Sequence, residues 1–328
     1  MKILPYPDKP IFQCYHDKAF QVGIIQANSP IDIKKWVCTK YVNCAFAPQS
    51  PMNKFIIMVS DDWGETEKLV NHQRFVVSKK SLDIMNLDLL HSLKSAIKNN
   101  AYIYGNYNEK YIPNKRAYKR EDFMHDFLLI GCDRDMFLSA GYVANGRFAK
   151  FEIPNQNMID GLLSLWGDDI NLNMYSYESE SVPTPNTKMM LDDLRKYISA
   201  IDQLNFLSPT EESRGIVTNI RLKEFFIDEV RRGKIYIDRR YARVLYEHKW
   251  VLAQLVDQFI DNTEKKKKHQ EWANSNMEKA YRVHLLGLKL SNSRNKSIIN
   301  SIASLMDQIT ESELYHIPRL IEDLEDLF

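Results

Sequence analysis

The sequence lacks any long hydrophobic run, and no stretch approaches the roughly 20 apolar residues that a transmembrane helix needs. Near the N-terminus, Pro5, Pro7 and Asp8 stand where a signal peptide requires apolar residues. The chain also lacks an excess of either charge, since 44 basic and 43 acidic residues leave a net charge of +1. Nucleic-acid-binding proteins usually carry a basic excess. We therefore expect a cytoplasmic protein that binds neither nucleic acid nor a membrane.

Several motifs of cofactor and metal sites are missing as well. The four cysteines show no C-x-x-C spacing, which argues against a zinc site or a set of disulfides in a chain of 328 residues. The adjacent carboxylates Asp168 and Asp169 have no histidine at ligand spacing. The sequence contains no glycine-rich phosphate loop of the Walker or dinucleotide type. We expect no bound metal and no resident cofactor.

The hydrophobic pattern changes character along the chain. Apolar steps of three and four residues predict a helix over residues 82–99. Apolar runs at 127–130, 136–142 and 147–153, separated by turn residues, predict a three-stranded antiparallel meander. From Lys188 onward, the pattern is helical almost throughout. We expect an α+β fold with a mixed domain over residues 1–170, a linker over 171–187 and an all-helical domain over 188–328.

Cys14 is the first candidate for chemistry. The apolar pattern after Pro10 predicts a helix that ends near residues 28–30, with Cys14 in its first turn. The positive end of the helix dipole would lower the pKa of this thiol and favour the nucleophilic thiolate. The alternative is that Cys14 is a small buried residue of the core, which is the commoner role of a cysteine.

His125 is the second candidate, because it opens the first strand of the predicted meander. A histidine at a strand end is rigidly mounted and can act as a general base. Its alternative is a solvated histidine or one bonded to the backbone. A cysteine nucleophile needs such a base within hydrogen-bond reach, and a cysteine followed by a distant histidine is the chain order of papain-like enzymes.

More specific information lies in the stretch from residue 97 to 142. It runs through Ala101-Tyr102-Ile103-Tyr104-Gly105, Tyr111-Ile112-Pro113 and His125-Asp126-Phe127-Leu128-Leu129-Ile130-Gly131-Cys132-Asp133. This succession resembles the N-terminal domain of the butirosin-biosynthesis acyltransferase family. Cys14 stands near the position of that family's cysteine. The segment Tyr246-Glu247-His248-Lys249 is similar to a Glu-His-Lys stretch in the family's helical C-terminal part.

The resemblance implies a papain-like, C39-peptidase-like fold and a role in the assembly of natural products, such as antibiotics of the nonribosomal peptide or polyketide type. Members move an acyl group from a carrier-protein thioester to a small amine acceptor, and a related papain-like enzyme forms amide bonds in closthioamide biosynthesis. By this resemblance, Cys14 would form the acyl-enzyme and His125 would act as its base. The substrate would arrive on the phosphopantetheine arm of an acyl or peptidyl carrier protein, and Gln13 would donate to the oxyanion.

One departure from the family pattern leaves the activity open. The orienting aspartate expected about sixteen residues after the histidine is replaced by Gly141. Tyr142 and Asn145 are alternative orienting groups. Three readings therefore remain: an acyltransferase, a catalytically degenerate protein that binds a peptide intermediate or a carrier protein, and a cysteine peptidase. The basic run Lys265–Lys268 either steers an acidic carrier or is an ordinary solvated helix end.

Overall fold

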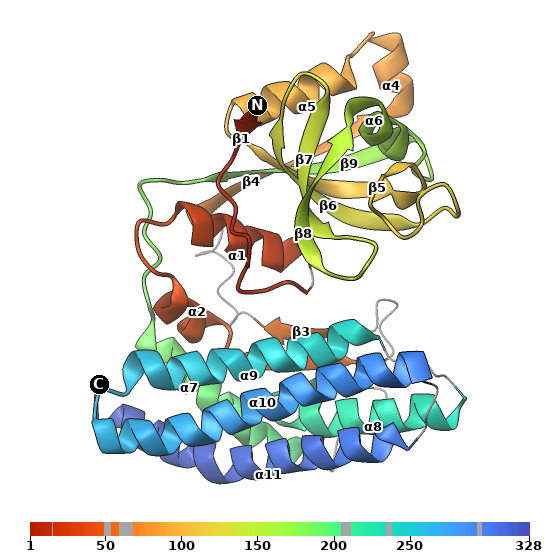
Figure 1. Cartoon of the computed structure of the whole chain (residues 1–328). Coiled ribbons are helices and arrows are strands. Elements are labelled where there is room, and N and C mark those ends of the chain that lie inside the picture. The colour runs from red at the N-terminus through yellow and green to blue at the C-terminus, as the bar shows by residue number, and fades with distance from the viewer. Residues whose placement is uncertain (15, 49–53, 59–67, 205–210, 234–237, 294–296) are drawn as a thin grey trace. The chain divides into compact units, whose positions relative to one another are not determined.

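The computed structural model describes residues 1–14, 16–48, 54–58, 68–204, 211–233, 238–293 and 297–328. The chain divides into two compact units (Figure 1). The first, which we call the sheet unit, contains Met1–Ile31 and Gly64–Val182. The second, which we call the helical unit, contains Asp32–Trp63 and Pro183–Phe328. An α+β chain with a mainly helical C-terminal half, as expected from the sequence, is confirmed.

The sheet unit is built on one antiparallel sheet. Its strands lie in the order β4-β9-β5-β6-β7-β8, and the short β1 pairs with β6. The predicted meander is confirmed as β6, β7 and β8, with its first turn held by Asp133, whose side chain accepts from the backbone N–H groups of Asp135 and Met136. The strands are β1 (Lys2–Ile3), β4 (Val70–Ser78), β5 (Tyr102–Asn108), β6 (Met124–Cys132), β7 (Met136–Tyr142), β8 (Phe148–Pro154) and β9 (Asp169–Tyr177).

One face of this sheet packs against helix α1 (His16–Asn28). The ring of Phe20 on α1 lies 5.8 Å from the ring of Tyr104 on β5 and 6.5 Å from that of Phe148 on β8. Gln21 donates to the Tyr175 hydroxyl on β9. We call this side of the sheet the α1 face.

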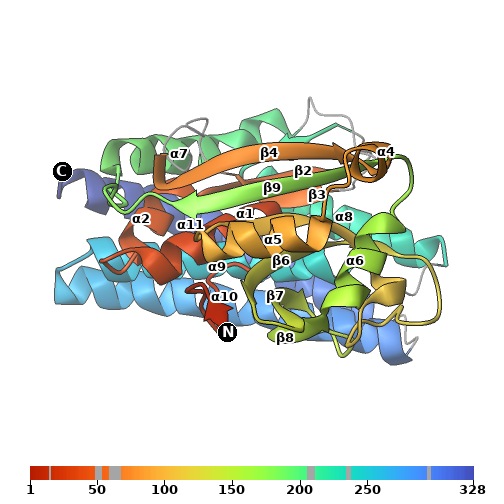
Figure 2. The ribbon, with the colours of Figure 1, turned by 90° about the horizontal axis from the view of Figure 1, so that it is seen from above.

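The opposite face packs against α5 (Leu89–Lys98) and α6 (Asn155–Leu163), and α4 (Lys79–Ile84) precedes α5. In Figure 2, α5 runs beside β9, and β4 lies on the far side of β9. The single helix predicted over residues 82–99 is therefore wrong in one respect, because two helices occupy this stretch. Asn86 has a φ of +49°, which breaks the first helix, and Asp88 caps the second by accepting from the His91 N–H.

The helical unit combines long amphipathic helices with a small antiparallel sheet, and the expectation of an all-helical domain over residues 188–328 is wrong at Ser213–Arg214, which forms a strand of that sheet. The long helices bury an apolar stripe, which on α9 includes Leu245, Leu252 and Leu255. This packing contributes more to the stability of the helices than helical propensity does. The helices are α2 (Lys34–Lys40), α7 (Thr187–Ser199), η2 (Ala200–Gln203), α8 (Val217–Arg231), α9 (Arg239–Phe259), α10 (Thr263–Ser293) and α11 (Ile298–Glu325). The strands β10 (Ser213–Arg214), β2 (Asn43–Ala47) and β3 (Lys54–Met58) lie in that order.

The observed division differs from the expected boundaries in two places. Residues 32–63 belong to the helical unit, because β2 pairs with β10, about 170 residues later in the chain. The first part of the expected linker 171–187 belongs to strand β9, which pairs with β4 and β5.

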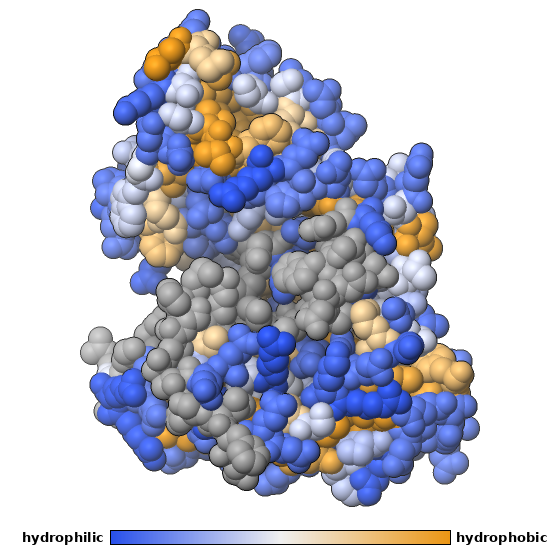
Figure 3. All heavy atoms as spheres, turned by 180° about the vertical axis from the view of Figure 1, so that it is seen from behind, coloured by the Kyte–Doolittle hydropathy of each residue, from blue (hydrophilic) through white to orange (hydrophobic). Residues whose placement is uncertain are grey.

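In the space-filling view, the visible surface of each unit is mainly hydrophilic, with hydrophobic patches among the hydrophilic residues (Figure 3).

Candidate functional site

Cys14 lies just outside helix α1, not in its first turn as the sequence analysis expected. The helix begins at His16. The segment before Cys14 is bound to the C-terminal end of this helix, where the Ile11 N–H donates to the Gln26 side chain at 3.0 Å. Cys14 is buried, with 6% of its surface exposed, and its Sγ lies 3.8 Å from the Tyr142 hydroxyl. The thiol thus faces the end of strand β7.

Tyr142 belongs to the α1 face of the sheet. It pairs with Phe148 in the β7–β8 ladder, and the two rings meet edge to face with centroids 5.7 Å apart. Phe148 in turn contacts Phe20 of α1. Of the two alternative orienting residues, Tyr142 is therefore the one that the structure brings to Cys14.

His125 finds a carboxylate that the sequence analysis missed. Its Nδ1 lies 3.4 Å from Oε1 of Glu109, at the start of the short helix η1 (Glu109–Tyr111) that follows β5. The imidazole also stacks on the Phe123 ring, with centroids 5.7 Å apart. A carboxylate orients a catalytic histidine by accepting a hydrogen bond from it, whereas Glu109 lies at ion-pair distance from Nδ1, a pair that is charged only when the ring is protonated.

The β-ladder assigns His125 to the face opposite α1. His125 pairs directly with Tyr107, whereas Tyr104, on the α1 face, pairs with Leu128. Successive side chains of a strand point to opposite faces of the sheet. In this part of β5, odd-numbered and even-numbered residues therefore lie on opposite faces, and the same holds for their partners in β6. The Tyr107 ring confirms the assignment, because it stacks on Phe127 and its Cβ lies near Gly161 of α6. The register therefore does not favour the direct thiol–imidazole pair expected for Cys14 and His125.

Lys115 completes the group around Glu109. Its Nζ lies 3.6 Å from Glu109 Oε1 and donates to the Tyr142 carbonyl oxygen at 2.5 Å. Burial lowers the pKa of Lys115 to about 8, although Glu109 opposes this shift. Burial also raises the pKa of Glu109, against the attraction of Lys115. For both side chains, the cost of removing the charge from water therefore outweighs their mutual attraction. Burial favours the neutral form of each group.

The other expected site residues have different surroundings. Asn145 is exposed, and its side chain accepts from the Arg147 N–H, so it stabilises the β7–β8 turn and not the imidazole. Gln13 is half-buried beside Cys14. Gly141 lies on the face of His125, because an added Cβ there would lie 3.9 Å from Lys115 Nζ. A carboxylate side chain at position 141 would therefore contact Lys115, which already pairs with Glu109.

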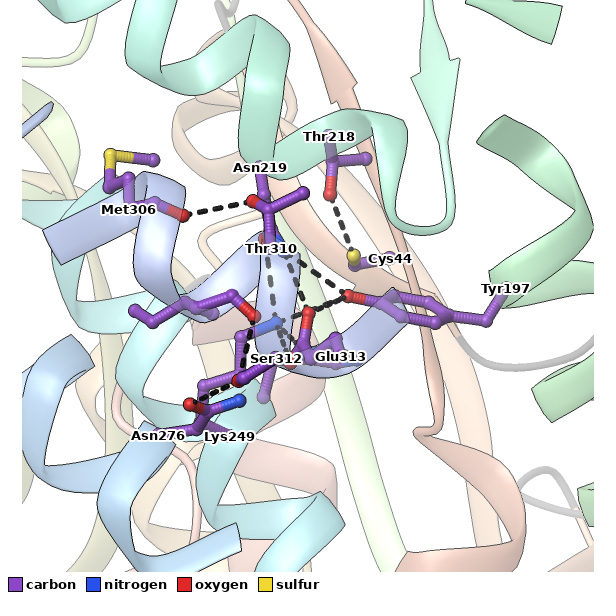
Figure 4. A network of polar contacts seen from close by, with 12 residues as sticks. Cys44, Tyr197, Thr218, Asn219, Lys249, Asn276, Met306, Thr310, Ser312 and Glu313 are labelled. Atoms are coloured by element: carbon purple, nitrogen blue, oxygen red, sulfur yellow. Dashed lines mark hydrogen bonds and ion pairs between the residues drawn. The ribbon is translucent and has the colours of Figure 1, made fainter. Parts of the chain in front are cut away.

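A second polar group lies in the interior of the helical unit (Figure 4). At its centre, Lys249 of α9 and Glu313 of α11 form an ion pair of 2.8 Å with neither side chain exposed. Glu313 also accepts from the Tyr197 hydroxyl at 2.9 Å and from the Asn219 amide at 2.8 Å. Nearby, the Cys44 thiol lies 3.0 Å from the Thr218 hydroxyl. These bonds connect α7, α8, α9, α11 and β2.

His248 belongs to the same interior group. One ring nitrogen lies 2.7 Å from the Val42 carbonyl oxygen and the other 3.1 Å from Lys249 Nζ. Burial, and next the charge of Lys249, hold the pKa of His248 well below its usual value. The ring is therefore neutral, with the protonated nitrogen donating to Val42 and the other accepting from Lys249. The Glu-His-Lys stretch that resembles the acyltransferase family is thus a structural element here.

The basic run also has a structural explanation in part. Lys265 pairs with Asp323 at 2.7 Å, and Lys266 pairs with Asp257 at 3.0 Å. Two of the four cations are therefore engaged within the helical unit, which favours the ordinary helix end. Among the described residues, no helix is long and apolar enough to cross a membrane, and no cluster of three or more histidine, cysteine, aspartate or glutamate side chains could hold a metal.

Comparison with known proteins adds no family to this description. No protein-family model matches the chain, and no curated protein matches it either.

Proposed function

We propose that the sheet unit is a papain-like domain and that the protein binds, in the cytoplasm, an acyl or peptidyl group delivered by a carrier protein, without forming a thioester on Cys14. The papain-like assignment is supported by a buried cysteine just before a helix that packs on an antiparallel sheet. The carrier-borne ligand is proposed on the sequence resemblance.

The observation that carries this proposal is the register of β5 and β6. It assigns His125 to the face of Tyr107, while the hydroxyl beside Cys14 comes from Tyr142 on the α1 face. A tyrosine hydroxyl is a poor base for a thiol near neutral pH, because with a usual pKa of about 10 it already carries its own proton. The assignment of His125 to the opposite face of the sheet supports ligand contact at Cys14 over nucleophilic attack.

A second candidate is the acyltransferase itself. The Glu109–His125 contact favours it, because it supplies the orienting carboxylate that the sequence lacks at Gly141. In that reaction, Cys14 would lose its thiol proton to His125, its thiolate would displace the carrier sulfur from the thioester, and His125 would return the proton to the departing carrier thiol. The amine acceptor would then attack the acyl-enzyme, lose its proton to His125 and regenerate the Cys14 thiol. The peptidase reading has no observation of its own.

The loading reaction separates the two candidates. The full chain is incubated with carrier proteins that bear acetyl, octanoyl or aminoacyl thioesters, and its intact mass is measured beside that of Cys14→Ala. We expect an acyl adduct on neither protein, and co-elution of each protein with the carrier in size-exclusion chromatography. A mass increase on the wild type that Cys14→Ala abolishes would contradict the binding proposal and establish the transferase.

Alkylation tests the thiol without any assumption about the substrate. The rate of Cys14 modification by iodoacetamide is followed against pH by peptide mass mapping in the wild type and in His125→Gln. We expect the two profiles to coincide, because the imidazole lies on the other face of the sheet. An inflection below pH 7 that disappears in His125→Gln would show that the imidazole activates the thiol.

A further inference from the structure

The sheet unit contains a cavity that the site around Cys14 does not use. It has a volume of about 460 Å³ and lies between α5 and the strands β4 and β9. It opens on the side of the sheet opposite the α1 face, because Met174 and Ser176 alternate with Tyr175, which contacts α1. The cavity is lined by Asn71, Gln73, His91, Ser92, Ser95, Ala96, Asn99, Ala101, Met174, Tyr175 and Ser176.

The lining is polar but carries no full charge from acidic, lysine or arginine side chains. Amides come from Asn71, Gln73 and Asn99, and hydroxyls from Ser95 and Ser176. An amide offers both donors and an acceptor, and a hydroxyl does the same with one oxygen. Such a lining complements a ligand whose own groups both donate and accept. The described lining residues provide no lysine or arginine to pair with a phosphate or carboxylate, and no acidic side chain to pair with a protonated amine.

These polar groups are available to a ligand. On the other face of the same two strands, the side chains bond to each other: His72 to Asn173 at 2.8 Å and Arg74 to Asn171 at 3.0 Å. Facing the cavity, Ser92 is engaged with the Asp88 carbonyl oxygen. Within the described part of the chain, no hydrogen bond involves the side chains of Asn71, Gln73, His91, Ser95, Asn99 or Ser176.

The composition of the lining also disfavours an aromatic base, because its described residues offer no phenyl or indole ring on the cavity side for stacking. Tyr175 is the one residue of the lining with a six-membered ring, and that ring stacks near Tyr104 on the α1 face. The apolar contribution on the cavity side comes instead from Met174, Ala96 and Ala101. These aliphatic groups can contact the C–H face of a saturated ring.

From this lining we propose that the cavity binds a neutral, polyhydroxylated small molecule of the carbohydrate class. Vicinal hydroxyls match the mixed donors and acceptors of the amides and hydroxyls, and the aliphatic residues match the ring face. The volume lies within the range of roughly 300–1,000 Å³ that is typical of small-molecule sites. This site is independent of Cys14 and of the proposed carrier.

Saturation-transfer NMR on the full chain tests the proposal. The probes are glucose, maltose and N-acetylglucosamine, with adenosine, inorganic phosphate and putrescine as comparisons. The cavity variant is Asn71→Val with Ser176→Val, because β-branched residues suit strands and preserve the sheet. The matched control is His72→Val with Asn173→Val, which changes the other face of the same two strands.

We expect at least one sugar to bind, with an affinity at least tenfold weaker in the cavity variant and unchanged in the control and in Cys14→Ser. Circular dichroism checks that both double variants keep the native spectrum. The proposal is overturned if no sugar binds, if sugar binding survives the cavity substitutions, or if adenosine, phosphate or putrescine binds there in place of the sugars.

Discussion

The ion pair between Lys249 and Glu313 is expected to be a main determinant of the stability of the helical unit. Neither side chain is exposed, so Glu313→Gln leaves a buried ammonium group without its counter-charge. Removing one partner of a buried pair costs about 3–5 kcal/mol. The glutamine keeps the size of the side chain, and it still offers an oxygen to Tyr197 or Asn219. The loss would therefore report mainly on the charge.

A double-mutant cycle isolates that charge. Lys249→Met combined with Glu313→Gln removes both charges, and we expect the double variant to be more stable than the sum of the two single losses predicts, by about 2 kcal/mol or more. The control cycle is Arg195→Met with Glu325→Gln, an ion pair whose side chains are 49% and 43% exposed. Its coupling should remain below about 1 kcal/mol.

Urea unfolding followed by tryptophan fluorescence measures both cycles. Trp36 and Trp272 are buried in the helical unit, so their emission reports on its unfolding. If Glu313→Gln costs less than about 1 kcal/mol while the native spectrum is retained, the buried Lys249 does not depend on the charge of Glu313. The reasoning from a buried, charged pair would then be refuted.

Three further predictions concern the same interior. Burial keeps His248 neutral in the folded protein, whereas its pKa in the unfolded chain is about 6.5, so below that pH the unfolded chain binds one proton more. The free energy of unfolding should therefore fall by up to about 1.4 kcal/mol per pH unit below pH 6.5. Urea titrations at several pH values should show a smaller pH dependence in His248→Gln. Gly215 has a φ of +59°, and an added Cβ would lie 2.4 Å from the Tyr197 carbonyl oxygen, so Gly215→Ala should cost about 2 kcal/mol or more by thermal unfolding. Gly233→Ala, at a φ of +86° with no atom within 4 Å of the new Cβ, should cost about 1 kcal/mol, and equal losses would contradict the clash. Burial raises the pKa of the Cys44 thiol to about 11, so iodoacetamide at pH 8 should label it only after denaturation; labelling of the native protein would show that the interior opens.

The local sequence pattern predicts the helices and strands of this fold better than it predicts which strands pair with one another. The meander over β6, β7 and β8 follows from apolar runs and turn residues that are adjacent in the sequence. The assignment of residues 32–63 to the helical unit depends on the pairing of Phe46 with Ser213. That register is set by tertiary packing across more than 160 residues, and no periodicity within either segment encodes it.

The same distinction applies to the site. The sequence indicates Cys14, Tyr142 and His125 as candidate residues, and the structure brings Cys14 to Tyr142. Glu109 was missed because it follows β5 and reaches His125 only through the β5–β6 ladder. The face on which His125 lies is equally hidden, since a shift of one residue in that ladder would reverse it. A strand sequence shows the alternation but not which face the helix covers.

Tyr142 is the physical link between the two halves of the candidate site. Its hydroxyl lies beside Cys14 on the α1 face, and its backbone carbonyl accepts from Lys115, which contacts Glu109 on the other face. A ligand that shifts the backbone of Tyr142 together with its ring would move the carbonyl oxygen bound to Lys115 as well. Binding at the thiol would thereby reach the Glu109–His125 pair through one residue at the end of β7. Such a shift would couple the two faces of the sheet without a proton passing between Cys14 and His125.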